Sequence, residues 1–265
     1  MLLVMIGLFR TASGQPVQDV PEPLQEVGVD EQLNAQVPLD AVFTDEHGNR
    51  VKLAQFVTGE RPVILTLNYY KCPMLCGLQL NGFLNGLKEL RWNPGEEFEI
   101  VTISINPLET PQLALEKKQN YLSQYVREGA GDGWHFLTGG EPAIRAVAEA
   151  VGFRYTYDPE TAQYAHAAAL MVLTPTGRVA RYLYGIEYPA KMLQLALREA
   201  RSGQIATTLD RILLYCYHYD SENRRYTPVA MNIMRLGGGA TALVLGISLG
   251  TMWFRELRRR RTKPN

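Results

Sequence analysis

The fold of this chain is decided by residues 63–77, which read VILTLNYYKCPMLCG. The first five are leucines or β-branched residues, as in a buried strand. Apolar residues then recur at helical spacing between Leu78 and Leu90. The segment therefore predicts a buried strand that leads directly into a helix, with Cys72 and Cys76 at the junction.

The junction is a place where thiols become reactive. The backbone N–H groups in the first turn of a helix are unpaired, and the helix dipole favours a thiolate over a thiol there. Pro73 suits the first helical position because it has no N–H to lose. If the helix has begun at this point, Cys72 and Cys76 lie one turn apart on the same face. Both sulfurs could then reach one ion or each other.

The Cys-x-x-x-Cys pair has three interpretations. It can be a dithiol redox pair that differs from the thioredoxin motif by one extra residue. It can be a metal site, which needs at least one further ligand beside the two thiolates. It can also be two ordinary buried thiols. The Cys-x-x-x-Cys pair taken alone does not decide between these three interpretations.

A third ligand can be sought among the four histidines. His47 lies in a predicted hairpin turn, His135 on a predicted strand, and His218 in a tyrosine-rich segment near the C-terminus. His166 comes directly before a later hairpin, and in a thioredoxin-like sheet that connection approaches the strand–helix junction. Two thiolates and one imidazole suit Cu(I) and can also hold Cu(II), whereas structural zinc normally takes four protein ligands. We therefore expect His166 to complete a copper site with the cysteines.

The rest of the chain predicts an α/β domain over residues 40–203. After the first strand–helix pair, two further strand–helix units lead to a hairpin and a last helix. This order predicts a thioredoxin-like fold with a central mixed sheet flanked by helices. The expected elements after residue 77 are a helix over 76–91, a strand over 98–105, a helix over 110–126, a strand over 134–137, a helix over 141–151, a hairpin over 168–184 and a helix over 189–200.

The two ends of the chain indicate export and membrane attachment. Residues 1–14 resemble a signal peptide without the usual positive start, and residues 15–39 are expected to form a linker. A tyrosine-rich connector over 204–234 leads to an uncharged apolar stretch that predicts a transmembrane helix over 235–255. The basic tail that follows, 256–265, places the C-terminus in the cytoplasm. The domain is then expected on the periplasmic, extracytoplasmic side of the inner (plasma) membrane, carried by a single span.

The composition limits the possible partners. Twenty-seven basic residues balance 27 acidic ones, so nothing in the overall charge indicates a nucleic-acid-binding protein. Three cysteines are too few for a disulfide scaffold. The third, Cys216, stands two residues before His218. A structural role for this pair is favoured, with a second or transfer copper position as the alternative hypothesis.

Several motifs taken in order resemble the Sco/SenC family of membrane-tethered copper proteins, which help to metallate the Cu(A) site of cytochrome c oxidase. They are YKCPMLC at 70–76, SINP at 104–107, FLTG at 136–139, and His166 followed by LMVLTPTG at 170–177. The resemblance implies a copper chaperone whose partner is the oxidase subunit that bears Cu(A). Other copper chaperones and thioredoxin-like reductants are further possible partners. It also implies that the copper ligands are Cys72, Cys76 and His166.

The sequence departs from the family pattern at three places. Asn106 stands where relatives usually have the first acid of an Asp-Pro…Asp-Thr pattern, and Glu109 follows it. Ala165 precedes the expected copper histidine where relatives often have Asp, which removes a carboxylate that could orient the imidazole. The predicted membrane anchor is C-terminal, whereas that of familiar members is N-terminal.

Two enzymatic functions remain as alternatives to copper delivery. The first is a thiol–disulfide oxidoreductase that uses Cys72 and Cys76 as catalytic residues to reduce the cysteines of the oxidase subunit or of another exported protein. The second is a peroxide reductase on the same fold. Copper binding needs His166 and dithiol exchange does not, so this histidine discriminates between them.

Overall fold

The computed structural model of the protein describes residues 27–72, 75–206, 219–220, 225–226, 237–239 and 241–253, and the side chains of residues 75–76, 219–220 and 225–226 are outside this description. The chain divides into two compact units, residues 1–206 and residues 207–265. The first unit contains the predicted α/β domain.

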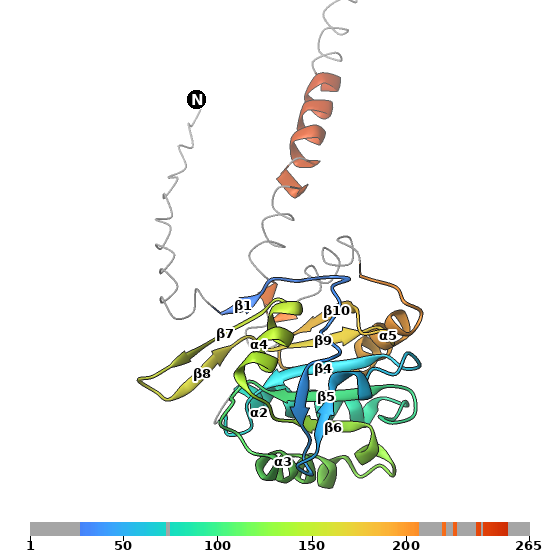
Figure 1. The fold of residues 1–265 in the computed structure, drawn as a ribbon. Coiled ribbons are helices and arrows are strands. Elements are labelled where there is room, and N and C mark those ends of the chain that lie inside the picture. Colours follow the sequence, from blue (N-terminus) through green and yellow to red (C-terminus); the bar gives the residue numbers. More distant parts are fainter. Residues whose placement is uncertain are drawn as a thin grey trace, which may run out of the picture. The chain divides into compact units, whose positions relative to one another are not determined.

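A five-stranded mixed sheet forms the centre of the first unit (Figure 1). Strands β4 and β5 are parallel, as are β5 and β6, while β9 runs antiparallel to β4 and β10 antiparallel to β9. All residues of β4 and β5 are buried, as expected for strands that are covered on both faces. The strands in spatial order are β10 (Val179–Tyr184), β9 (Ala169–Leu173), β4 (Val63–Asn68), β5 (Glu99–Ser104) and β6 (Trp134–Leu137).

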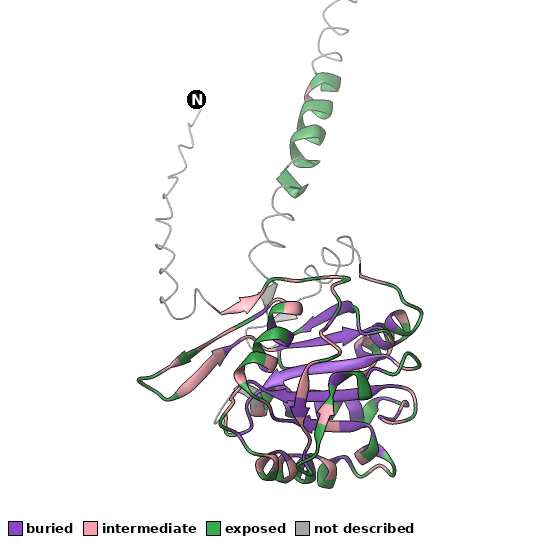
Figure 2. Ribbon diagram, viewed as in Figure 1, coloured by how far each residue is buried: buried purple, intermediate pink, exposed green. Residues whose placement is uncertain are grey.

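Helices cover both faces of this sheet. Residues of α2, α3 and α5 belong to the hydrophobic cluster on one face, whereas residues of α4 belong to the cluster on the other. Figure 2 shows the resulting buried centre with exposed outer helix surfaces. The helices are α2 (Leu75–Glu89), α3 (Pro111–Tyr125), α4 (Glu141–Ala150) and α5 (Ala190–Arg201). The predicted thioredoxin-like order of elements is therefore confirmed.

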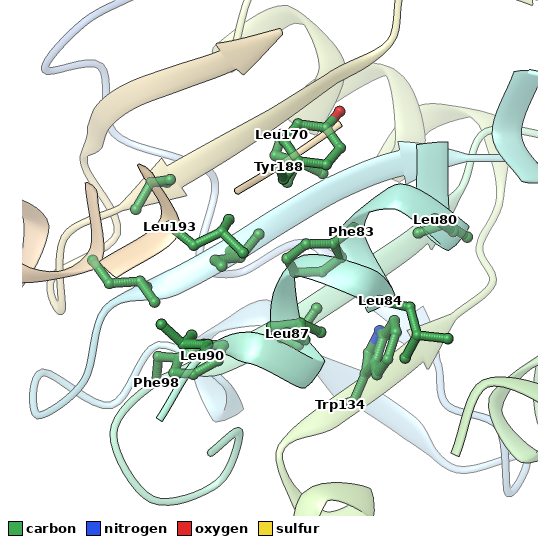
Figure 3. Packing of buried hydrophobic residues seen from close by; sticks show 14 of the residues in the cluster. Leu80, Phe83, Leu84, Leu87, Leu90, Phe98, Trp134, Leu170, Tyr188 and Leu193 are labelled. Carbon is green, nitrogen blue, oxygen red and sulfur yellow. The ribbon is translucent and has the colours of Figure 1, made fainter. Parts of the chain in front are cut away.

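The face covered by α2 contains an aromatic core (Figure 3). The ring of Phe83 on α2 lies 5.9 Å from that of Trp134 on β6 and 6.1 Å from that of Tyr188, which precedes α5. The indole N–H of Trp134 donates to the hydroxyl of Thr102, so this large side chain is buried without an unpaired donor. These contacts attach the helix that follows Cys72 to the sheet.

The predicted helix over 110–126 and the predicted hairpin turn at His47 are both present in the structure. Thr110 caps α3 by accepting a hydrogen bond from the Leu113 N–H, with Pro111 in the first turn. The hairpin formed by β2 (Val42–Thr44) and β3 (Arg50–Lys52) turns at Asp45, whose carboxylate accepts from the backbone N–H groups of His47 and Asn49.

The structure differs from the prediction around residues 153–166. Strands β7 (Phe153–Asp158) and β8 (Gln163–His166) form an antiparallel hairpin that extends away from the central sheet (Figure 1). It is not part of the sequence-based prediction. Strand β1 (Gly28–Val29) pairs with β7, and Val37 is fully buried. Residues 28–39, expected to belong to a linker, are therefore packed against the domain.

Little of the second unit is described. Strands β11 (Tyr219–Asp220) and β12 (Arg225–Tyr226) pair antiparallel. Residues 237–239 and 241–253 are helical. Within the described residues, no helix reaches the length and apolar character needed to cross a bilayer. The other residues of the predicted span 235–255 lie outside the described part, as do the predicted signal peptide, the basic tail, Cys216 and His218.

Candidate metal centre

Cys72 lies in the connection between β4 and α2. The strand ends at Asn68, Tyr69 and Tyr70 are buried, and Cys72 is half-buried. Its backbone N–H donates to the Tyr69 carbonyl at 3.3 Å, which forms a turn in the chain. Cys72 itself is not helical, and the described part of helix α2 is Leu75–Glu89.

Cys76 is the second residue of α2, so its backbone lies in the helical first turn. This backbone position agrees with the predicted placement of a cysteine residue at the N-terminus of a helix, where the helix dipole favours thiolate. Its side chain is outside the described part of the structure. Among the described side chains, which do not include that of Cys76, no three His, Cys, Asp or Glu residues form a metal-binding group.

His166 is the last residue of β8, and only 6% of its surface is exposed. Its Nδ1 lies 2.9 Å from the carbonyl oxygen of Ala167. Because a carbonyl oxygen can only accept, Nδ1 carries the proton in this contact. This is the tautomer that a metal-binding histidine uses when its second ring nitrogen is held by the backbone.

The sheet topology brings the chain around Cys72 and His166 to one edge. Strands β4 and β9 are antiparallel with Thr66 opposite Leu170, so the chain leaving β4 passes the chain entering β9. The rings of Tyr69 and His166 are 6.1 Å apart in an edge-on arrangement. Cys72 packs against the buried cluster that contains Tyr69. The structure thus supports the predicted convergence of the cysteine junction and the histidine.

Aromatic residues surround this edge. The Tyr164 ring lies 5.7 Å from that of Tyr69, and the Phe153 ring lies 6.0 Å from that of His166. Burial raises the pKa of Tyr155 to about 12, with a further increase from the negative charge of Glu141. Burial also raises the pKa of Tyr164. Both shifts favour the protonated phenol.

Sequence reasoning gave no site role to Glu109, although its carboxylate holds the chain before Cys72. Glu109 is only 8% exposed. It accepts hydrogen bonds from the backbone N–H groups of Tyr70 and Lys71, at 2.7 and 2.8 Å, and from the Ser104 hydroxyl at 2.6 Å. The sequence does place the acidic Glu109 after the predicted strand over 98–105, directly before the Thr110-Pro111 pair that begins the next helix.

Asn106 and Ala165, two of the places where the sequence departs from the family pattern, have defined positions in the structure. The side-chain oxygen of Asn106 accepts a hydrogen bond from the Leu108 N–H at 3.0 Å, which stabilises the turn after β5. Ala165 lies opposite Thr156 in the β7–β8 hairpin. Neither residue supplies a carboxylate to the site.

Two further histidines have other surroundings. His47 is exposed in the predicted turn. His135 Nε2 lies 3.2 Å from Glu99, which also pairs with Arg61, and its ring is 4.2 Å from that of Phe56. Glu99 is the first residue of β5, so this cluster lies at the end of the parallel strands opposite to Cys72. These contacts give His135 a structural role at the start of the sheet, and its placement on a strand agrees with the prediction.

The fold and the site define a thioredoxin-like domain with a cysteine pair at the first strand–helix junction and a buried histidine beside it. The chain belongs to the SCO1/SenC family, whose family model matches residues 30–200. This finding confirms the family resemblance seen in the sequence. No curated protein sequence matches the chain.

Solved structures show the same fold. A candidate electron transfer protein from Aquifex aeolicus VF5 is 26% identical with a TM-score of 0.55, over 65% of this chain and 95% of that one. A SCO1/SenC family lipoprotein from Bacillus anthracis str. Ames is 15% identical with a TM-score of 0.50, over 66% and 98%. BsSco, described with a disulfide switch as a member of the Sco family of cytochrome c oxidase assembly proteins, is 21% identical with a TM-score of 0.50, over 67% and 98%.

Proposed function

We propose that this protein is a membrane-tethered copper chaperone that binds copper through Cys72, Cys76 and His166 and assists assembly of the Cu(A) site of cytochrome c oxidase. The proposal rests mainly on one observation. The cysteine junction and His166 lie at the same edge of the sheet, where the ring of Tyr69, which precedes Cys72, lies beside that of His166. Membership of the SCO1/SenC family supports it.

The donor set fits copper better than the other common ions. Two thiolates are soft donors, and an imidazole nitrogen adds a borderline one, a combination that suits Cu(I) and can also hold Cu(II). Calcium and magnesium take oxygen ligands, and structural zinc would take a fourth protein ligand. In this proposal His166 is already held in the metal-binding tautomer by its contact with Ala167.

Delivery of the ion follows from an incomplete ligand set. A copper ion with three protein ligands can accept a thiolate from an incoming protein before it releases its own ligands, so transfer needs no free ion. The Cu(A)-bearing subunit of cytochrome c oxidase is the recipient we propose, since BsSco is named among cytochrome c oxidase assembly proteins. Oxidised cysteines cannot bind the ion, so loading requires the reduced pair.

We place the domain on the extracytoplasmic side of the membrane, anchored by residues 235–255. The stretch carries no charge between Leu236 and Phe254, and a cluster of arginines follows it. In the described helical part, large apolar side chains such as Leu243 and Trp253 are more than half exposed, which suits contact with lipid (Figure 2). Removal of residues 235–265 should release the protein from membranes, and continued resistance to alkaline extraction would contradict this placement.

Titration of the purified protein with Cu(I) and Cu(II) tests the ligand assignment. Wild type should bind one copper ion, and His166→Ala and Cys72→Ser should each bind it at least about ten-fold more weakly, because each variant loses one of three ligands. His47→Ala is the matched control, since His47 is exposed in a turn and should leave affinity unchanged. Equal affinity of His166→Ala and wild type would refute the assignment.

A thiol–disulfide oxidoreductase is the second candidate. It is favoured by the position of Cys76 in the first turn of α2, where thiolate is stabilised, and by the disulfide switch described for BsSco. In this function Cys72 and Cys76 would reduce the cysteines of the oxidase subunit or of another exported protein. A purified protein that reduces disulfides but binds no copper would establish this function instead, and His166→Ala would then retain activity.

A further inference from the structure

Glu109 is not one of the proposed copper ligands, but it contacts the backbone directly before Cys72. We infer that Glu109 is a positioning residue, whose carboxylate fixes the backbone at Tyr70 and Lys71 and thereby sets where Cys72 meets His166. This inference rests on the proposed copper site for its functional consequence. The positioning itself can be measured without copper.

The first argument is the local loss of sheet pairing. The β4–β5 ladder ends at Asn68 and Ser104, followed by one more bond from the Ile105 N–H to the Asn68 carbonyl. Beyond this point the backbone N–H groups of Tyr70 and Lys71 bond to the Glu109 carboxylate. The buried Tyr70 donor needs a partner, and here a side chain from the neighbouring strand–helix connection supplies it and also binds the partly buried Lys71 N–H.

The second argument is that the acceptor is itself held in place. The Ser104 hydroxyl accepts from the Asn106 N–H at 3.1 Å and donates to Glu109 at 2.6 Å. The Glu109 N–H bonds to the Asn106 carbonyl, and Thr110 directly after it caps α3. The carboxylate is therefore presented from a fixed turn between β5 and α3 rather than from a mobile side chain on the surface.

The third argument concerns the path to the thiol. The hydroxyl of Tyr70 lies 3.0 Å from the Thr102 carbonyl and 2.7 Å from that of Leu137, so this residue is held at its ring as well as at its backbone. Cys72 is two residues further on and turns back through its bond to the Tyr69 carbonyl. Displacement of the backbone at 70–71 would consequently shift Cys72 relative to His166.

Glutamine in place of Glu109 keeps the size of the side chain but turns one acceptor oxygen into a donor amide. That amide must face an N–H or O–H donor, so at least one of the three bonds is lost. In copper-free Glu109→Gln, amide exchange at Tyr70 or Lys71, measured by NMR, should rise about ten-fold or more. In the loaded variant, copper should pass to a competing Cu(I) chelator several-fold faster than from wild type.

Thr110→Ala is the matched control, because it weakens the α3 cap but removes none of the hydrogen bonds to the Glu109 carboxylate. It should lower global stability while leaving amide exchange at 70–71 and copper release unchanged. Glu109→Asp, which keeps the charge but is one methylene shorter, should recover part of the wild-type behaviour. Unchanged amide exchange at Tyr70 and Lys71 in Glu109→Gln would refute the inference that Glu109 holds this backbone. Faster exchange with unchanged copper release would refute the inference that Glu109 positions Cys72.

Failure of the copper function itself would be recognised separately, because wild type would then bind no copper. In that case the positioning of Cys72 is read from the equilibrium of the dithiol and disulfide forms in glutathione buffer. A shift of this equilibrium in Glu109→Gln, absent in Thr110→Ala, would support the inference. Equal equilibria in wild type and Glu109→Gln would overturn it.

Discussion

Helix α2, which starts at the cysteine junction, packs against the chain before α5 at distances that only glycine allows. A Cβ atom on Gly82 would lie 1.7 Å from the Ile186 carbonyl oxygen, and one on Gly86 would lie 1.9 Å from that of Tyr188. Gly77, two residues into the same helix from its start at Leu75, has nothing within 4 Å of such an atom. Alanine at these positions is therefore predicted to have opposite effects on stability.

The magnitude follows from two opposing terms. Alanine is a better helix former than glycine by up to about 1 kcal/mol, a gain that applies to both sites. At Gly82 the new methyl group meets a backbone carbonyl that cannot rotate away, so helix and segment must separate, and overpacking of this kind costs about 1–3 kcal/mol or more. We expect Gly77→Ala to stabilise the protein by about 0.5 kcal/mol and Gly82→Ala to destabilise it by about 2 kcal/mol.

Urea unfolding followed by circular dichroism measures both values, provided that the denaturant slopes of the variants agree. The expected result is a higher midpoint for Gly77→Ala and a lower midpoint for Gly82→Ala. Equal midpoints for the two variants would refute the close packing of α2 against residues 186–188.

Two further predictions concern buried polar groups. Lys118→Met should destabilise the protein by about 3 kcal/mol in the same unfolding assay, because it leaves the buried Glu46 carboxylate without the Lys118 ammonium group. The double variant Lys118→Met, Glu46→Gln should lose less unfolding free energy than the sum of the two single variants. Additive losses would contradict the pairing. Burial raises the pKa of Tyr155 to about 12, so its contribution to stability is complete below about pH 10 and is lost as the pH rises towards 12. Between these values the unfolding free energy of Tyr155→Phe should fall by about 1 kcal/mol less than that of wild type, after allowance for the partial exposure of the ring; parallel pH profiles would contradict this.

Most of the central fold could be predicted because its signals are local. The β-branched run before Cys72 and the apolar spacing after it define β4 and α2 without any knowledge of their neighbours. Thr110 followed by Pro111 marks the start of α3 in the same way. The place of His166 beside the cysteine junction followed from the order of the elements, because the chain entering β9 must pass the end of β4.

The remaining features depend on contacts that are distant in sequence. In β7 the buried Phe153 is followed by the exposed Arg154, the half-buried Tyr155 and the exposed Tyr157, so no apolar run distinguishes it from a loop. Strand β1 is only two residues long and is defined by its pairing with β7. The role of Glu109 depends on backbone donors about 40 residues away in the chain. Residue types alone do not show such pairings.

X-ray absorption at the copper edge tests the central claim most directly, because it reports the atoms bound to the ion. Copper-loaded wild type should show two sulfur ligands and one imidazole nitrogen, and the signature of the imidazole should disappear in His166→Ala while both sulfurs remain. A spectrum without sulfur ligands, or one that is identical in wild type and His166→Ala, would contradict a copper site built from Cys72, Cys76 and His166.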